Sequence, residues 1–113
     1  MPLTSDTREI VDRQFVRAMK PGAILINTAR GELVNEAELA AALSDGHLSG
    51  AGLDVFAQEP ADPRNPLLQL ANVVTSPHVA WLTMETLNRS MAVAVENVRR
   101  LSKGEVLLHE VFA

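Results

Sequence analysis

Three side chains able to do acid, base or anion-binding chemistry each stand at or just past the end of a short apolar run that predicts a β-strand. These are Arg30, Asp54 and His78, and Glu59 lies in the loop after Asp54. The carboxyl ends of parallel strands meet at one edge of a sheet, where ligands bind, so we expect the four side chains to share one cleft. A cation, two carboxylates and a histidine in one cleft suit the proton-coupled reduction of a carbonyl group.

Each of these residue types has a role in reducing a 2-oxo acid. His78 is the natural proton donor to the carbonyl oxygen, because histidine exchanges protons near neutral pH, and Glu59 beside it would fix the imidazole tautomer. Arg30 can grip the substrate carboxylate with two parallel hydrogen bonds, which lysine does less well. Taken alone, Arg30 could instead be a solvated loop cation and Glu59 a turn residue. Asp54 could equally cap a helix or form a turn, and His78 could cap a strand.

The stretch around Arg30 predicts a strand, a polar loop and a helix, in that order. Residues 23–26 form an apolar run too short for an independent helix, and they predict a strand buried on both faces. Asn35 is a favourable N-cap with Glu38 at the capping-box position, so a helix starts here. Gly46 is its expected end.

Two further strands and two further helical segments are predicted. Residues 51–56 and 73–75 predict strands, and the proline-containing residues 58–70 between them predict a loop, of a length that is usually functional. Near the N-terminus, Asp6 or Thr7 can cap a helix whose apolar residues recur as far as Met19, with Asp12 able to cap a restart.

The last predicted helix starts at a Thr83 cap and ends at Gly104. Its apolar stripe, over residues 87–101, is expected to be core. Residues 105–113 are apolar enough to dock but show no clear period. The alternation of helices and strands predicts an α/β fold with parallel strands and right-handed crossovers, in a partial Rossmann-like domain with three αβα layers.

Composition sets limits on the function. The chain has 113 residues, 47% of them apolar, with 10 basic and 14 acidic side chains, which fits one globular domain and shows no basic patch for nucleic acid. There is no cysteine, so we expect no disulfide, and we expect no metal site. No apolar run approaches the roughly 20 residues of a membrane span, and residues 1–6 do not resemble a signal peptide. A cytoplasmic protein is expected.

Four motifs resemble those of the D-isomer-specific 2-hydroxyacid dehydrogenases, in that family's order. They cover nearly the whole chain and are Pro2-Leu3-Thr4 with Thr7, Thr28-Ala29-Arg30-Gly31 followed by Leu33-Val34-Asn35-Glu36-Ala37-Glu38-Leu39, Gly52-Leu53-Asp54-Val55-Phe56 with Glu59-Pro60, and Ser76-Pro77-His78-Val79-Ala80. Any one alone would be weak evidence, but four in order make a chance match improbable.

The resemblance implies an oxidoreductase that transfers a hydride between NAD(P)H and a 2-oxo acid, with NAD favoured over NADP. It implies Arg30, Glu59 and His78 as catalytic residues. It also implies that Asp54 accepts a hydrogen bond from the nicotinamide carboxamide, with His78 beside the same ring. Thr28, Ala29 and Arg30 would line the nicotinamide end of the cofactor.

Part of that family's pattern is missing. The chain has no Gly-x-Gly-x-x-Gly motif to hold a pyrophosphate at a helix N-terminus, and no substrate domain. We therefore expect residues 1–113 to be the C-terminal half of an NAD(P)-binding Rossmann-type domain, inactive or nearly so on its own. A homodimer, or association with the missing half, is expected.

The substrate and the class of function have alternatives. Trp81 after His-Val-Ala resembles the glycerate dehydrogenase and hydroxypyruvate reductase branch, which favours hydroxypyruvate or glyoxylate. D-3-phosphoglycerate and D-lactate are the other substrates considered, and formate is disfavoured because that branch carries Gln where Glu59 stands. A different class of function is a non-catalytic α/β module that self-associates through an exposed sheet edge or regulates a longer relative.

Overall fold

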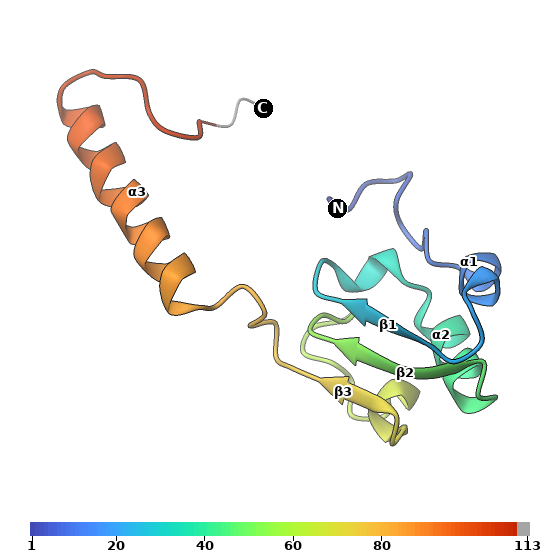
Figure 1. Cartoon of the computed structure of the whole chain (residues 1–113). Coiled ribbons are helices and arrows are strands. Elements are labelled where there is room, and N and C mark those ends of the chain that lie inside the picture. Colours follow the sequence, from blue (N-terminus) through green and yellow to red (C-terminus); the bar gives the residue numbers. More distant parts are fainter. Residues whose placement is uncertain (111–113) are drawn as a thin grey trace. The chain divides into compact units, whose positions relative to one another are not determined.

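The computed structural model describes residues 1–110 in two compact units, Met1–Ala80 and the segment that starts at Trp81. Each unit is described by itself. The first holds a three-stranded sheet with its helices, and the second is built on one long helix (Figure 1). None of the helices among the described residues combines the length and the hydropathy needed to cross a lipid bilayer.

The sheet of the first unit is parallel and follows the chain order β1-β2-β3. Its strands are β1 (Ala23–Asn27), β2 (Leu48–Leu53) and β3 (Val73–Thr75). Asn27 is paired with Leu53, and Leu53 with Thr75, so all three strands end level with one another. The second strand begins and ends three residues earlier than the predicted 51–56, which corrects that boundary and leaves Asp54 just beyond the strand.

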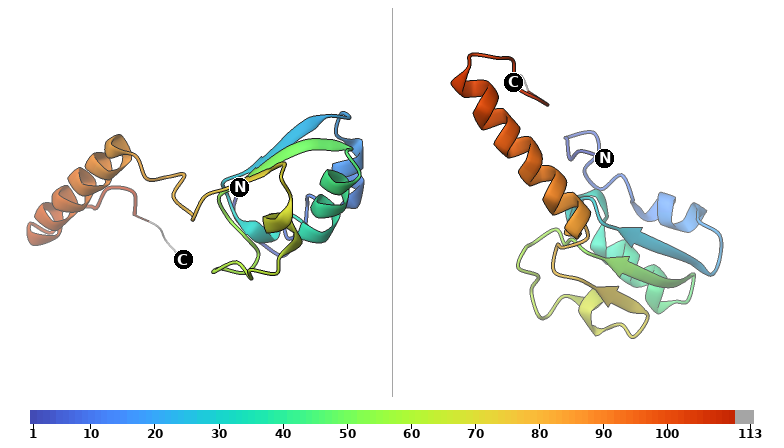
Figure 2. Two further views of the ribbon diagram at one scale, coloured as in Figure 1. Left: turned by 90° about the horizontal axis from the view of Figure 1, so that it is seen from below. Right: turned by 60° about the vertical axis from the view of Figure 1, so that its left-hand side comes forward.

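Helix α2 (Glu36–Ser44) covers one face of the sheet, as Figure 2 shows, and it starts where the sequence predicts. The Asn35 side chain accepts a hydrogen bond from the Glu38 N–H at 3.1 Å, and Gly46 follows the C-cap with φ +78°. The capping box is only half formed, because the Asn35 N–H donates to the Val11 carbonyl at 3.0 Å.

The N-terminal segment differs from the prediction. Only α1 (Arg13–Ala18) is helical, and Asp12 is its N-cap, so the predicted helix start at Asp6 or Thr7 is wrong. The physical reason is a pairing distant in sequence: the Val11 N–H donates to the Leu33 carbonyl at 2.9 Å, and Val11 forms a parallel bridge with Val34. These bonds, with one from the Glu9 N–H to the Glu32 carbonyl at 2.7 Å, hold residues 9–11 beside residues 32–34 instead of in a helix. Helix α1 packs against α2.

The core of the first unit lies between the sheet and α2. Its most buried large side chains are Leu39, Leu48, Leu67 and Val16. The other face of the sheet is open: Ile24, Ile26 and Val74 are 64%, 72% and 75% exposed. The prediction that the first strand is buried on both faces is therefore wrong for this structure. Residues 1–80 supply two layers of the expected three, because no helix among them covers the open face.

Two short 3₁₀ helices complete the first unit, η1 (Gly31–Leu33) before α2 and η2 (Pro66–Gln69) inside the predicted 58–70 loop. Asn65 caps η2, accepting a hydrogen bond from the Leu67 N–H at 3.0 Å. The long loop is thus partly ordered by its own local helix, which places the buried Leu67 in the core.

The second unit consists of helix α3 (Met84–Ser102) and the segment after it. Thr83 caps the helix, as predicted, and Gly104 follows its end with φ +66°. No α3 residue is buried, and the apolar stripe expected to be core is exposed. Nothing among residues 81–110 packs over that stripe, because the segment after the helix is bonded to its polar side.

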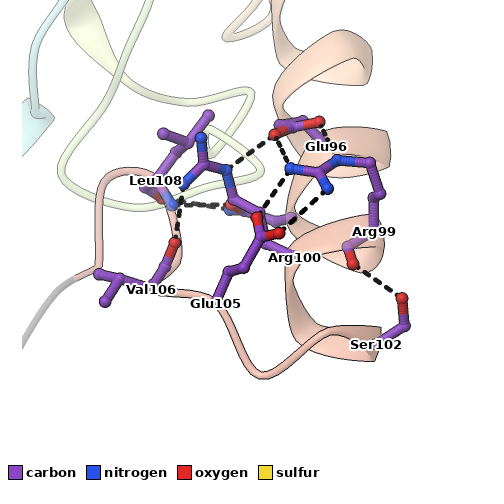
Figure 3. A network of polar contacts seen from close by, with 8 residues as sticks. Glu96, Arg99, Arg100, Ser102, Glu105, Val106 and Leu108 are labelled. Carbon is purple, nitrogen blue, oxygen red and sulfur yellow. Dashed lines mark hydrogen bonds and ion pairs between the residues drawn. The ribbon is translucent and has the colours of Figure 1, made fainter.

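A polar network ties that segment to the end of α3 (Figure 3). Arg99 pairs with Glu96 at 2.7 Å and with Glu105 at 2.8 Å, and Arg100 pairs with Glu96 at 2.8 Å. Hydrogen bonds to Arg99 and Arg100 lower the pKa of Glu96 to about 2. The segment predicted to dock, residues 105–113, therefore folds back on its own helix as far as it is described, and residues 111–113 lie outside the described part.

Candidate active site

An imidazole–carboxylate pair lies at the carboxyl edge of the sheet. His78 Nδ1 lies 2.8 Å from Glu59 Oε2, and the other carboxylate oxygen of Glu59 accepts the Phe56 N–H at 3.1 Å. The bond to His78, and after it the bond to Phe56, lower the pKa of Glu59. Glu59 is thus a carboxylate at neutral pH and can only accept, so His78 Nδ1 must carry the proton. Proton exchange with a substrate then falls to Nε2, the other ring nitrogen.

Asp54 holds the segment that carries His78. Its carboxylate accepts hydrogen bonds from the Ser76 hydroxyl and from the Val79 and Ala80 N–H groups, both at 2.9 Å. The backbone adds a further bond, from the His78 N–H to the Asp54 carbonyl at 2.8 Å. His78 has φ +57°, a conformation that a residue other than glycine adopts at a cost when its surroundings impose it. The Asp54 side chain, on a residue only 4% exposed, holds the backbone at Val79 and Ala80, directly after His78.

These bonds also set the charge of Asp54. The Ser76 hydroxyl has the largest effect and the two N–H groups add to it, so the pKa of Asp54 is lowered although burial opposes the change. The Asp54 carboxylate is therefore ionised at neutral pH, as the Glu59 carboxylate is. It lines a pocket of about 570 Å³ together with Glu59 and His78.

The loop that carries Arg30 is shaped by Asn27, the last residue of β1. Its buried side chain donates to the Arg30 carbonyl at 2.8 Å and accepts the Ala29 N–H at 3.1 Å. The Arg30 guanidinium is exposed and donates to the Ala29 carbonyl at 2.6 Å. Arg30, Glu59 and His78 line one pocket of about 250 Å³, whose other residues are Gly31, Glu32, Phe56 and Ala57.

The structure therefore brings the three residues predicted to be catalytic around one small pocket. Asp54 does not line that pocket. It anchors the His78 segment and lines the larger pocket of about 570 Å³. Thr28 is exposed and Ala29 half-buried, and neither lines the pocket that Arg30, Glu59 and His78 share. The cofactor contacts predicted for Thr28, Ala29 and Asp54 stay predictions.

Three residues that shape the site were not anticipated. Asn27 is the last residue of β1 and Ser76 directly follows β3, and a polar residue at a strand end is a signal for a turn. The sequence places Glu36 only within the motif that follows Arg30, whereas its carboxylate accepts hydrogen bonds from residues 21 and 29 positions away. No sequence pattern announces such a contact, because it depends on the tertiary path of the loop.

The arrangement can bind an anion and move a proton. A guanidinium beside an imidazole–carboxylate pair can hold a carboxylate group and transfer a proton to or from the atom next to it. Among residues 1–110 no three His, Asp or Glu side chains are placed to hold a metal ion. The guanidinium and the imidazole–carboxylate pair suit acid–base chemistry on a small acid.

Comparison with known proteins agrees with this chemistry. Residues 1–80 match the family described as D-isomer-specific 2-hydroxyacid dehydrogenase, NAD binding domain. A glyoxylate reductase of Korarchaeum cryptofilum is 44% identical over 106 residues, which are 94% of this chain and 32% of that protein. A glyoxylate/hydroxypyruvate reductase B of Pectobacterium carotovorum is 46% identical over 106 residues, 94% of this chain and 33% of that protein.

A solved structure shows the same fold. The D-isomer-specific 2-hydroxyacid dehydrogenase of Xanthobacter autotrophicus Py2, in complex with NADPH and MES, superimposes with a TM-score of 0.83 and is 39% identical. The match covers 99% of this chain and 46% of that one. The chain spans about a third of the length of these two reductases.

Proposed function

The chain belongs to the D-isomer-specific 2-hydroxyacid dehydrogenase family, and from this premise we propose that it carries the catalytic residues for NAD(P)-dependent reduction of a 2-oxo acid. Residues 1–113 would be the C-terminal half of the NAD(P)-binding domain. The observation that carries the proposal is the His78–Glu59 pair, 2.8 Å apart, in one pocket with Arg30.

In the proposed reaction Arg30 binds the substrate carboxylate with two parallel hydrogen bonds and so orients the neighbouring carbonyl. His78 gives the proton on Nε2 to the carbonyl oxygen, and Glu59, bonded to Nδ1, balances the charge of the imidazolium. General acid catalysis of this kind accelerates a reaction by about 10²–10⁴-fold. The products are a 2-hydroxy acid and the oxidised cofactor, and His78 regains a proton from solvent.

The nicotinamide cofactor would supply the hydride when it is bound. The groups at the position expected for the nicotinamide ring fit that cofactor. Oδ2 of Asp54 accepts one hydrogen bond, from Ala80, and so keeps capacity to accept another from a carboxamide. The loop of Thr28, Ala29 and Arg30 is held by Asn27, which would fix its backbone beside the ring. NAD is favoured over NADP by the family's description as an NAD-binding domain, although one relative was solved with NADPH.

Glyoxylate and hydroxypyruvate are the proposed substrates. The relatives named as glyoxylate and hydroxypyruvate reductases support this choice, as does Trp81 after His78-Val79-Ala80. A D-3-phosphoglycerate dehydrogenase of Mycobacterium tuberculosis is also 44% identical, over 105 residues, so D-3-phosphoglycerate is the second candidate. D-lactate is a third. The test is to compare the rate of cofactor oxidation with each of these substrates under the same conditions.

The function is tested by NADH and NADPH oxidation, followed by absorbance with glyoxylate or hydroxypyruvate. We expect the purified 113-residue chain to show no steady turnover, because the binding energy of the rest of such a protein would hold the cofactor for reaction. We expect turnover when this chain replaces the matching segment of the Korarchaeum relative. His78→Ala in that chimera should lower kcat by about 10²–10⁴-fold.

A folded chimera whose turnover is unaffected by His78→Ala would refute the assignment of His78. Steady turnover by the purified chain alone would refute only the expectation that it is inactive by itself.

A non-catalytic module is the second candidate function. The open face of the sheet favours it, as does the edge of β1 that no other described strand pairs with, because such an edge can pair with another chain. In that case the chain would act as a homodimer or by association with a longer relative, in the cytoplasm, and replacement of His78 would leave the association unchanged.

A further inference from the structure

We propose that Glu36 is a positioning residue for Glu59, because it fixes the loop that carries Glu59 and thereby aligns that carboxylate with His78. The proposal concerns the geometry of the His78–Glu59 pair, and its importance for catalysis rests on the function proposed above. Glu36 does not line the pocket of Arg30, Glu59 and His78, so it would act through Glu59 alone.

The Glu36 carboxylate bridges two points of the loop. At the first position of α2, its Oε1 accepts the Ala57 N–H at 2.7 Å, and its Oε2 accepts a hydrogen bond from Asn65 Nδ2 at 2.7 Å. Ala57 precedes Glu59 by two residues, and Asn65 follows it by six. One side chain on a rigid helix therefore holds both arms of the loop.

The same loop also packs closely against Gly31, near the hydrogen bonds to Glu36. A Cβ built on Gly31 would lie 1.9 Å from the Phe56 carbonyl carbon and 2.3 Å from the Ala57 nitrogen. The backbone at residues 56–57 therefore packs directly on Gly31. The N–H of Ala57, in the same peptide group, donates to Glu36. The Phe56 N–H in turn donates to Glu59 at 3.1 Å, which carries the alignment to the carboxylate that meets His78.

Glu38 provides a matched control. It also lies in the first turn of α2 and is half-buried, so both residues place the same charge at the same helix end. The hydrogen bonds from Ala57 and Asn65 are made by Glu36 alone of the two. A general effect on α2 should appear in both variants, and a positioning effect only in the Glu36 variant.

The experiment is an NMR titration of the Glu59 side-chain carboxyl carbon in the 113-residue chain and in Glu36→Ala, Glu36→Gln and Glu38→Ala. Glu36→Ala should raise the pKa of Glu59 by about 0.5 or more, because the bonds to His78 and Phe56 loosen. The loss of a nearby negative charge alone would lower that pKa, so the direction separates positioning from charge. The other charged groups around Glu59 are His78, Asp54, Arg30 and Glu32, and all are unchanged in these variants.

Glu36→Gln keeps an oxygen for Ala57 and loses the acceptor for Asn65, so an intermediate pKa is expected. It also keeps the test open if Glu36→Ala does not fold. Glu38→Ala should leave the pKa of Glu59 as it is. An unchanged or lowered pKa in Glu36→Ala and Glu36→Gln would overturn the proposal, as would an equal rise in Glu38→Ala. None of these readouts needs turnover, so a failure here is distinct from a failure of the proposed activity.

Discussion

At the scale of single residues, the candidate site keeps its charged groups partly in water and uses buried groups to aim them. The side chains of His78 and Glu59 are 42% and 40% exposed, whereas Asp54 and Asn27, which hold their segments, are almost fully buried. An exposed ion pair alone contributes little to stability. The geometry of the site is therefore set by the buried Asp54 and Asn27, and its chemistry is left to side chains that a substrate can reach.

Arg30→Lys should weaken substrate binding more than it slows the reaction step. Lysine is a point charge and cannot form the planar two-bond contact with a carboxylate. A hydrogen bond to a charged group contributes about 1.5–3 kcal/mol, so in the chimera the KM for glyoxylate should rise by about 10-fold or more. The matched control is Arg64→Lys, at an exposed cation paired with Asp62 at 2.8 Å. An unchanged KM in Arg30→Lys would show that Arg30 does not bind the carboxylate.

Asp54→Asn should remove an acid-sensitive element of the His78 segment. Because the pKa of Asp54 is lowered by Ser76, Ala80 and Val79, its contribution to stability is complete above the usual aspartate pKa of about 4. It is lost as the pH falls through the lower value of the folded state. The protection of the Val79 and Ala80 amides, measured as the exchange rate relative to that of an unfolded chain at the same pH, should thus fall at low pH in the wild type. In Asp54→Asn this acid-dependent loss should be absent. At least one of the two amides should be less protected at every pH value, because an amide side chain offers one acceptor oxygen in place of two.

Asp62→Asn is the control for that measurement, since the pKa of Asp62 is also lowered, by Arg64, but in a different loop. It should leave the Val79 and Ala80 amides as protected as in the wild type. If Asp54→Asn left both amides as protected as in the wild type at every pH value, the Asp54 carboxylate would not be what holds the segment.

At the scale of elements, Gly31 lets the 3₁₀ helix η1 lie directly on the Glu59 loop. Gly31→Ala should force residues 56–57 to move and cost about 1–3 kcal/mol of unfolding free energy, as overpacking does. Gly46→Ala is the control: its strain comes from φ +78° and should cost about 1 kcal/mol. Urea unfolding gives both values, and only Gly31→Ala should shift the NMR signals of Phe56 and Ala57. Equal shifts in both variants would contradict this account of the loop.

The elements also show what the sequence can and cannot predict. The Asn35 cap, the Gly46 stop and the Thr83 cap were predictable, because each is a signal read within a few residues of its effect. The path of residues 9–11 was not, because hydrogen bonds to residues 32–35 outweigh their helical period.

The same division holds for the site. Arg30, Asp54 and His78 were placed at one sheet edge by the rule that parallel strands end together, and the structure has them there. The anchoring by Asp54 and Glu36 was not predictable, since a carboxylate in the sequence does not show which N–H groups will reach it.

At the scale of the whole molecule, the chain presents apolar surface that a folded protein ordinarily covers. Ile24, Ile26 and Val74 stand exposed on one face of the sheet, and β1 forms one edge of that sheet among the described strands. Exposed apolar patches and open edges mark association surfaces. The chain should therefore self-associate with rising concentration, which sedimentation velocity measures.

The double variant Ile24→Lys with Ile26→Lys should lower that association, because two charges on the face oppose its burial. It should leave the core intact, since both side chains point away from it. Combined with His78→Ala, it separates the two candidate functions. One outcome is that the activity of the chimera depends on His78 and that the association of the 113-residue chain depends on Ile24 and Ile26. The open face would then be the surface on which the rest of such an enzyme packs. Association without any activity that depends on His78 would favour the non-catalytic module.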